Sequence, residues 1–367
     1  MLFVKNNMKN ITKKIIRHSK KILLAPKNLF YWFLNIPLKP KWVVLMATDM
    51  CNSRCNHCNI WKEKSTPNPL TPKELEKIFS DKLFKNVEYI LCTGGEATLR
   101  TDFKEMIMAM HRALPNAVIQ LSTNAILQEK GLDIVKFALE NNIKFDIGVS
   151  LDGIGDAHDK IRGVPGNFEK ADWLLKESIK LREKYGPEKL HVGAGAVVSD
   201  LTVDSIYQTR EYAKNMGIDF VEAWYNTSSF YGNYSEGDKS KIKEKITKIV
   251  KSQCPSVMQD KWLSFLKGKS IKFPCFAINS FFVLKCNGDI VPCLSHWDAS
   301  IGNVRDHSPS EVWYGKKAKE ARQFVKKCPG CLNNWGAGWS FESSYYQILF
   351  FYLKRPDILI KKLLSKE

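Results

Sequence analysis

Cys51-Asn-Ser-Arg-Cys55-Asn-His-Cys58 follows the apolar segment 42–48, and this stretch is the strongest indication of fold and function in the chain. Thiolates at such short spacing bind iron–sulfur clusters or zinc. A [4Fe-4S] cluster usually takes four thiolates, so a triplet without a fourth cysteine nearby leaves one iron without a protein ligand. The triplet therefore predicts a metal centre with one position open to chemistry.

Short apolar segments alternate with amphipathic ones between residues 42 and 224. The predicted strands cover 42–48, 89–93, 118–122, 144–151, 190–198 and 219–223, and predicted helices follow residues 71 and 102 and cover 131–141, 168–184 and 203–216. Thr71 and Glu74 predict a capping box for the first helix, and Asp102 and Glu105 predict another for the second. This repetition indicates parallel strands with right-handed crossovers, either in an open doubly wound sheet or in a partial barrel.

Polar and glycine-rich motifs stand at the carboxyl ends of the predicted strands. Gly94-Gly95-Glu96 follows the second strand, Asn124 follows the third and Ser150 lies at the end of the fourth. Glycines let the backbone approach a bound molecule closely, and a carboxylate accepts hydrogen bonds from an ammonium group. Since ligands bind at this end of parallel strands in both architectures, we expect these motifs to form one site with the cysteines.

The CxxxCxxC spacing and the Gly-Gly-Glu motif resemble the radical S-adenosylmethionine (SAM) superfamily over about residues 42–225. The resemblance implies a partial (β/α)6 TIM-like barrel, with a [4Fe-4S] cluster whose open iron takes the amine and carboxylate of SAM. The implied cluster ligands are Cys51, Cys55 and Cys58, and the implied SAM contacts are Gly94, Gly95, Glu96, Asn124, Ser150 and Arg162. Ala97 departs from the proline that the family often has. Zinc is the alternative occupant, but it would not need motifs at three later strand ends.

A second group of cysteines surrounds the turn 287–292. It resembles the SPASM extension of radical SAM enzymes, and in particular its shortened twitch form. The resemblance implies an auxiliary [4Fe-4S] cluster held by Cys275, Cys293, Cys328 and Cys331, whereas Cys286 lies inside the hairpin and is not expected to bind. Four protein ligands would close this cluster to substrate and leave it electron transfer. A cluster that only stabilises a small domain is the alternative.

The two resemblances imply a radical SAM oxidoreductase. Such an enzyme cleaves SAM reductively to a 5′-deoxyadenosyl radical, which takes a hydrogen atom from a C–H bond, and it needs an electron donor of flavodoxin or ferredoxin type. We expect a small-molecule, sugar or lipid-linked substrate, since the segment before Trp42 is too short for a leader-binding winged-helix module. A peptide-modifying maturase and a non-catalytic basic metal-binding protein are the alternatives, and no catalytic side chain is assigned.

The chain has a formal net charge of +18, and its basic residues gather at both ends. They alternate with Ile and Leu before the first acid at Asp49, which predicts a basic amphipathic arm, and a similar pattern recurs at the C-terminus. Neither apolar run reaches the ~20 residues that span a bilayer. The arms therefore either lie on an anionic membrane or pack on the core with solvated lysines. Nucleic acid is disfavoured, because the aromatic residues do not alternate along a basic stripe.

These patterns divide the chain into five predicted parts. They are a basic amphipathic arm over 1–40, a radical SAM partial barrel over 41–225, a helical linker over 226–270, a SPASM/twitch region over 271–340 and a basic amphipathic helix over 341–367. The ten cysteines come in clustered spacings and no signal peptide opens the chain, which favours a reducing cytoplasm where thiols bind iron. Binding of the arms to lipid would place the protein on the inner membrane face.

Overall fold

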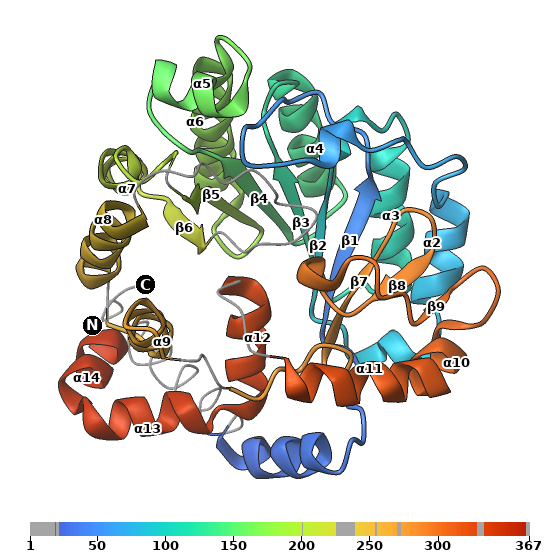
Figure 1. Cartoon of the computed structure of the whole chain (residues 1–367). Coiled ribbons are helices and arrows are strands. Elements are labelled where there is room, and N and C mark those ends of the chain that lie inside the picture. The colour runs from blue at the N-terminus through green and yellow to red at the C-terminus, as the bar shows by residue number, and fades with distance from the viewer. Residues whose placement is uncertain are drawn as a thin grey trace, which may run out of the picture.

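One curved sheet of nine strands organises the molecule, with most helices on its outer side (Figure 1). The computed structural model describes residues 19, 22–199, 201–224, 239–253, 255–269, 273–328 and 334–364. The strands are β1 (Trp42–Thr48), β2 (Tyr89–Gly94), β3 (Val118–Thr123), β4 (Phe145–Ser150), β5 (Leu190–Val198), β6 (Asp219–Trp224), β7 (Phe281–Leu284), β8 (Asp289–Val291) and β9 (Gly302–Asn303). Their order across the sheet is β6-β5-β4-β3-β2-β1-β7-β8-β9.

The helices follow the strands in the alternation that the sequence predicts. They are α2 (Pro72–Phe79), α3 (Phe103–Ala113), α4 (Gln128–Glu140), α5 (Asp156–Arg162), α6 (Asn167–Tyr185), α7 (Ile206–Asn215), α8 (Lys239–Ser252), α9 (Val257–Leu266), α10 (Pro309–Tyr314), α11 (Lys316–Lys327), α12 (Asn334–Ser344), α13 (Tyr346–Lys354) and α14 (Pro356–Leu364), with one more at 22–33. Strands β1 to β6 are parallel. The six predicted strands are confirmed within one residue at each end.

The sheet has a different environment on each face because successive strand residues point to opposite sides. Leu45, Ile119 and Ile147 are buried in the large core between the sheet and its covering helices. Val44 and Met46 point to the other face, where they pack with Ile60 beyond the cysteine triplet. β6 and β9 are the two ends of the strand order, so the curved sheet stays open as a partial barrel.

The start of α2 agrees with the predicted capping box, but the start of α3 does not. Thr71 and Glu74 cap α2 reciprocally. Asp102 precedes α3, yet both of its carboxylate oxygens accept hydrogen bonds from Arg100, at 2.7 and 2.6 Å. The prediction of a second capping box was wrong, because a charge-assisted bidentate pair is stronger than a bond to one helix N–H group.

The cysteine-rich region continues the barrel sheet. β7 pairs in parallel with β1, with Val43 opposite Phe282, and β7 and β8 form the predicted hairpin. Its turn is shorter than the predicted 287–292, because 289–291 already form β8. Gly288 sits in this turn at φ +93°, a conformation that glycine adopts without strain. The barrel and the cysteine-rich region thus share one sheet.

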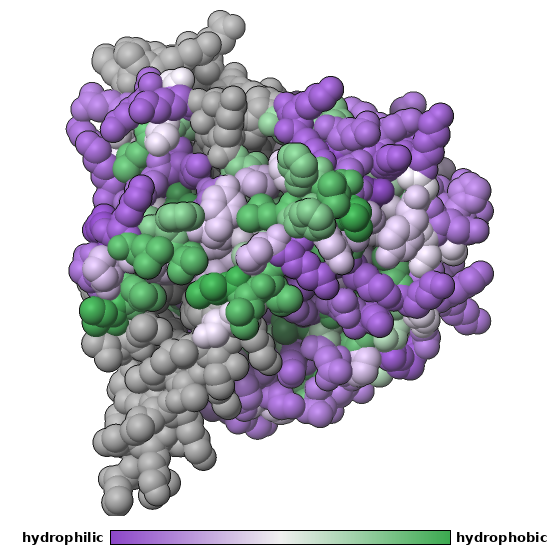
Figure 2. All heavy atoms as spheres, turned by 90° about the horizontal axis from the view of Figure 1, so that it is seen from below, coloured by the Kyte–Doolittle hydropathy of each residue, from purple (hydrophilic) through white to green (hydrophobic). Residues whose placement is uncertain are grey.

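The terminal segments lie together at the lower end of the molecule in Figure 1. The predicted single helix over 341–367 is instead the end of α12 followed by α13 and α14. That prediction was wrong because Pro356 cannot continue α13 and serves as the first residue of α14. Figure 2, which shows this end from below, reveals patches of apolar side chains among hydrophilic ones. None of the helices in the described ranges is long and apolar enough to span a membrane.

Candidate active site

The cysteine triplet lies in the loop after β1, directly against the Gly-Gly-Glu motif after β2. Gly95 N donates to Thr48 O at 2.7 Å, and Glu96 N donates to Met50 O at 2.7 Å. A Cβ atom on Gly95 would lie 2.0 Å from Met50 O, and one on Gly94, at φ +140°, would lie 2.1 Å from Thr48 O. The two glycines therefore let the end of β2 approach the base of the cysteine loop.

Glu96 is buried and ties neighbouring strand ends together. Its Oε1 accepts hydrogen bonds from Thr98 Oγ1 at 2.7 Å and from Thr123 Oγ1 at 2.8 Å, and its Oε2 accepts from Asn124 N at 2.7 Å. Burial raises the pKa of this carboxyl, while the same hydrogen bonds favour its charged form. The structure thus gives the predicted SAM contact a second task, which is to fix the end of β3 beside the cysteine loop.

The cysteines of the triplet are close enough to influence one another electrostatically. Burial raises the pKa of Cys51 to about 11 and that of Cys58 to about 12, and the neighbouring Cys55 sulfur raises both as well. Thiolates must replace thiols when metal binds, so these sulfurs need a cation to stabilise their charge. This donor set fits an iron–sulfur cluster. Within the described ranges, no group of three Cys, His, Asp or Glu side chains is arranged to hold a single metal ion.

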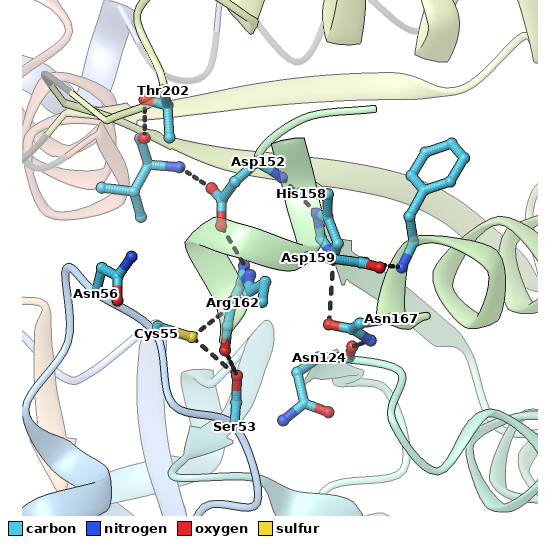
Figure 3. A network of polar contacts seen from close by, with 12 residues as sticks. Ser53, Cys55, Asn56, Asn124, Asp152, His158, Asp159, Arg162, Asn167 and Thr202 are labelled. Atoms are coloured by element: carbon cyan, nitrogen blue, oxygen red, sulfur yellow. Dashed lines mark hydrogen bonds and ion pairs between the residues drawn. The ribbon is translucent and has the colours of Figure 1, made fainter. Parts of the chain in front are cut away.

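Two polar side chains reach the sulfur of Cys55, one of the three predicted cluster ligands (Figure 3). Ser53 Oγ lies 3.0 Å from Cys55 Sγ, and Arg162 Nη1 donates to it at 3.4 Å. Arg162 Nε lies 2.7 Å from Oδ2 of Asp152, whose Oδ1 accepts from Val197 N. Burial alone would lower the pKa of Arg162, but the Asp152 carboxylate and the Cys55 and Cys58 sulfurs together outweigh it, so the pKa rises. Arg162, the arginine predicted to contact SAM, thus contacts the sulfur of Cys55.

A second chain of hydrogen bonds runs from Asp152 to Asn124 (Figure 3) and from there to Asn52 in the cysteine loop. Asp152 N donates to His158 Nδ1 at 3.1 Å, and His158 Nε2 lies 3.2 Å from Asn167 Oδ1. Asn167 Nδ2 donates to Asn124 O at 2.9 Å, and Asn124 Nδ2 donates to Asn52 Oδ1 at 2.8 Å. Burial lowers the pKa of His158 to about 4, so the ring is neutral near pH 7 and acts as a fixed link. Sequence reasoning missed both His158 and Asn167 as links of this kind.

Ser150 ends β4 beside Gly195 of β5. Gly148 and Gly193 pair with each other one step earlier on the same face of these strands. The three glycines add no side chains of their own beside Ser150, and the Gln120 and His191 side chains lie 2.9 and 3.4 Å from where a Cβ atom on Gly148 and on Gly193 would be. The alternating glycines of the segment 193–195 carry this signal in the sequence, and our sequence analysis did not use it.

Three of the later cysteines lie in one neighbourhood. His296 N donates to Cys293 O at 3.1 Å, and His296 Nε2 lies 3.7 Å from Cys328 Sγ. Cys275 packs in the same cluster as Val325, whose carbonyl accepts from Cys328 N. Sequence reasoning missed His296. The predicted fourth ligand, Cys331, lies outside the described residues.

Cys286 is buried and contacts a different part of the chain from those three cysteines. Its Sγ lies 3.5 Å from Oγ1 of Thr66, in the loop after the triplet, and its carbonyl accepts from Leu70 N. Burial raises the pKa of the Cys286 thiol. These contacts support the prediction that Cys286 binds no cluster.

Comparisons with known proteins agree with the two-part site. Residues 45–186 match the Radical SAM superfamily, and residues 275–332 match an iron-sulfur cluster-binding domain of the SPASM type. The chain is 33% identical to Fe-coproporphyrin III synthase of Methanosarcina barkeri over 164 residues, which are 43% of this chain and 40% of that protein. It is 24% identical to the sporulation killing factor maturation protein SkfB of Bacillus subtilis over 196 residues, which are 53% and 44% of the two chains. The matched part is thus less than half of either relative.

A solved structure supports the fold. The structure of anSMEcpe with bound AdoMet and a Kp18Cys peptide superimposes with a TM-score of 0.59 at 20% identity. The superimposed region covers 88% of this chain and 99% of the anSMEcpe chain. The likeness therefore extends over the barrel and the cysteine-rich region together.

Proposed function

This chain is a radical SAM protein with a C-terminal SPASM domain, and on that premise we propose that it oxidises a small-molecule, sugar or lipid-linked substrate. The family supplies its cofactors, which are SAM, the [4Fe-4S] cluster that binds it, and an auxiliary [4Fe-4S] cluster. When bound, the first cluster and SAM supply a 5′-deoxyadenosyl radical that removes a hydrogen atom from substrate. The protein itself would hold the clusters, orient SAM and substrate, and accept the electron that the substrate radical releases.

The proposal rests mainly on one observation, which is that the cysteine loop lies against the ends of β2, β3 and β4. Cys51, Cys55 and Cys58 would hold the first cluster, and Arg162 would offset the negative charge on Cys55 through its contact at 3.4 Å. Ser150 borders the glycine-lined face on which SAM would lie. Because Gly94, Gly95, Glu96 and Asn124 are fixed by hydrogen bonds or backbone packing, they would present SAM with a prearranged surface.

The auxiliary site supports oxidation as the net reaction. Cys275, Cys293 and Cys328 come together in the described part of the SPASM domain, and Cys331 would complete the set. A cluster with four protein ligands has no position for substrate, so it would accept the electron that the substrate radical releases. An acidic flavodoxin or ferredoxin would supply the electron that reduces the first cluster.

The printed names of the relatives include a porphyrin synthase and a peptide maturation protein, so they do not fix the substrate. The basic and apolar helices at the lower end support a substrate carried on a lipid (Figure 2). A test incubates the reduced enzyme with deuterated lipid extract, deuterated water-soluble metabolites or deuterated peptides. Deuterium should enter 5′-deoxyadenosine only from the lipid extract or the metabolites. Deuterium from peptides alone would establish the maturase alternative.

Anaerobic reconstitution tests the reaction class. The wild-type protein should bind about eight irons per chain, as two cubes require, and should release 5′-deoxyadenosine when reduced with SAM present. C51A/C55A/C58A should lose this release entirely, whereas the matched variant C293A/C328A should keep the first cluster and some uncoupled cleavage. A colourless protein that binds zinc and releases no 5′-deoxyadenosine would instead be the non-catalytic alternative.

A further inference from the structure

Large apolar side chains are exposed on several helices at the lower end of the molecule (Figure 2). In the helix at 22–33, Leu23 is 77% exposed and Phe33 is 74% exposed, and Leu353 in α13 is 66% exposed. Phe30, Phe350 and Ile360 are exposed as well. Single exposed apolar residues are common, but several large ones gathered on one face mark a contact surface.

The helix at 22–33 is firmly attached through its other side. Ala25 is buried, Asn28 Nδ2 donates to Ser343 O of α12 at 2.8 Å, and Trp32 Nε1 donates to Cys275 O at 2.8 Å. Lys326 of α11 donates from Nζ to Phe33 O at 2.8 Å. Since polar contacts fix the inner side, the outward direction of Leu23 and Phe33 is a property of the folded helix.

Basic side chains accompany the apolar ones. Lys27, Lys354 and Arg355 are exposed on these helices, and Asp357 is the acid beside them, 3.6 Å from Arg355. The lower end therefore combines protruding apolar groups with positive charge, which is the composition of interfacial helices.

A hollow between α9 and α13 opens beside these cations. It has a volume of about 460 Å³, and its lining includes Lys261, Lys354, Arg355 and Phe350, with Asp260 as its acidic member. A second hollow of about 440 Å³ shares Val257 and Phe351 with it and is lined mainly by aromatic and apolar residues, with Glu342 among them. A hollow with cations in its lining thus lies beside a mainly aromatic and apolar one, and an anionic lipid likewise has a charged end and an apolar end.

We propose that this lower end docks on the surface of an anionic lipid bilayer, and that the hollow between α9 and α13 takes the phosphate of one lipid. Leu23, Phe33 and Leu353 enter the headgroup region, and the basic residues attract the anionic surface. The cysteine loop lies at the opposite end of the sheet in Figure 1, so it stays accessible to an electron donor. The proposal does not depend on the radical chemistry.

Vesicle flotation of the full chain tests the docking surface. The wild type should float with vesicles of phosphatidylcholine and phosphatidylglycerol, should stay behind with phosphatidylcholine alone, and should be released by salt. L23S/F33S/L353S should lower the partition coefficient about tenfold or more, because the apolar contacts are lost. K354Q/R355Q should lower it about thirtyfold, given the energy that each basic residue contributes near an anionic surface.

Matched controls separate this surface from unspecific effects. K176Q/K180Q removes the same charge from α6, and W173S removes an exposed aromatic side chain there, and both should float like the wild type. C51A/C55A/C58A should also float, so a protein that fails to cleave SAM can still confirm docking. Equal binding by all variants, no binding by the wild type, or a dimer that the lower-end variants dissociate without vesicle binding would each overturn the proposal.

Discussion

Arg162 and Asp152 form a buried ion pair beside Cys55, and the loss of this pair should lower the stability of the fold considerably. Asp152 is fully buried, so R162Q would leave its carboxylate without a counter-charge. We expect R162Q to lower the free energy of unfolding of the metal-free protein by about 3–5 kcal/mol, as for other broken buried pairs. Guanidinium unfolding measures this change.

The double variant D152N/R162Q is the control for that measurement. It removes both charges, so it should be less destabilised than R162Q alone. Equal losses in the single and the double variant would show that the uncompensated carboxylate is not the cause.

Gly95 should tolerate no side chain, since a Cβ atom there would lie 2.0 Å from Met50 O. G95A should therefore push the cysteine loop outward and cost about 1–3 kcal/mol, the usual range for overpacking. Denaturant unfolding and iron bound per chain after reconstitution are the two measurements. Gly338 in α12 has no atom within 4 Å of an added Cβ, so G338A should retain iron and be no less stable than the wild type. Full iron binding by G95A would contradict the close packing.

For Glu96 and Asn124, the sequence predicted that they belong to the site but not which groups they bind. Their position after strand ends predicted that they belong to the site, and the structure places both beside the cysteine loop. Their hydrogen bonds to the protein were not predictable, because a carboxylate or amide accepts the same donors from a ligand as from a neighbouring strand. Only the fold shows which donors are within reach.

At the scale of elements, a polar row crosses the inner face of the sheet from β2 to β6. Tyr89 donates to Gln120 and to Asp146, and His191 lies 2.9 Å from Asp146 and 2.7 Å from Asp219. Hydrogen bonds to the two carboxylates raise the pKa of His191 to about 10 from 6.5. The charged imidazole thus links β4, β5 and β6.

This pair of bonds makes stability depend on pH. Because the folded pKa is raised, the contribution of His191 is complete below pH 6.5 and is lost as pH rises through about 10. Wild-type stability should fall over this interval, modestly because the side chain is half exposed. In H191Q the stability should not show this decrease between pH 6.5 and about 10. In H307Q, which changes an exposed histidine before α10, the stability should decrease as in the wild type. Thermal unfolding at several pH values decides, and identical pH profiles for H191Q and the wild type would refute the assignment.

The strands and helices themselves were largely predictable, but some of their ends were not. Strand positions follow from runs of apolar residues that only a buried sheet accommodates. The division into α13 and α14 follows from Pro356, a signal in the sequence that the prediction overlooked. The start of α3 instead depended on competition between neighbours, since Arg100 binds the Asp102 carboxylate. Such competition depends on side-chain positions in space, and a residue pattern does not contain them.

For the whole molecule, the pairing of β7 with β1 predicts that the barrel does not fold without the SPASM domain. Phe282 of β7 contacts the rings of Phe84 and Trp313, so removing β7 opens the core beside β1. A chain ending at residue 270 should therefore aggregate, which size-exclusion chromatography would show. C293A/C328A keeps β7 and should stay soluble and monodisperse. A soluble fragment with native circular dichroism would contradict this dependence.

The sequence by itself was enough to predict the cofactors of this protein. The cysteine triplet, the Gly-Gly-Glu motif and the later cysteines identify the cofactors because ligand type and local spacing are properties of short segments. Tertiary structure alone decided that Arg162 contacts Cys55, that β7 extends the barrel sheet, and that Asn28 of the helix at 22–33 binds Ser343 of α12. The physical reason is that these contacts join residues far apart in the chain, and only folding sets their distances.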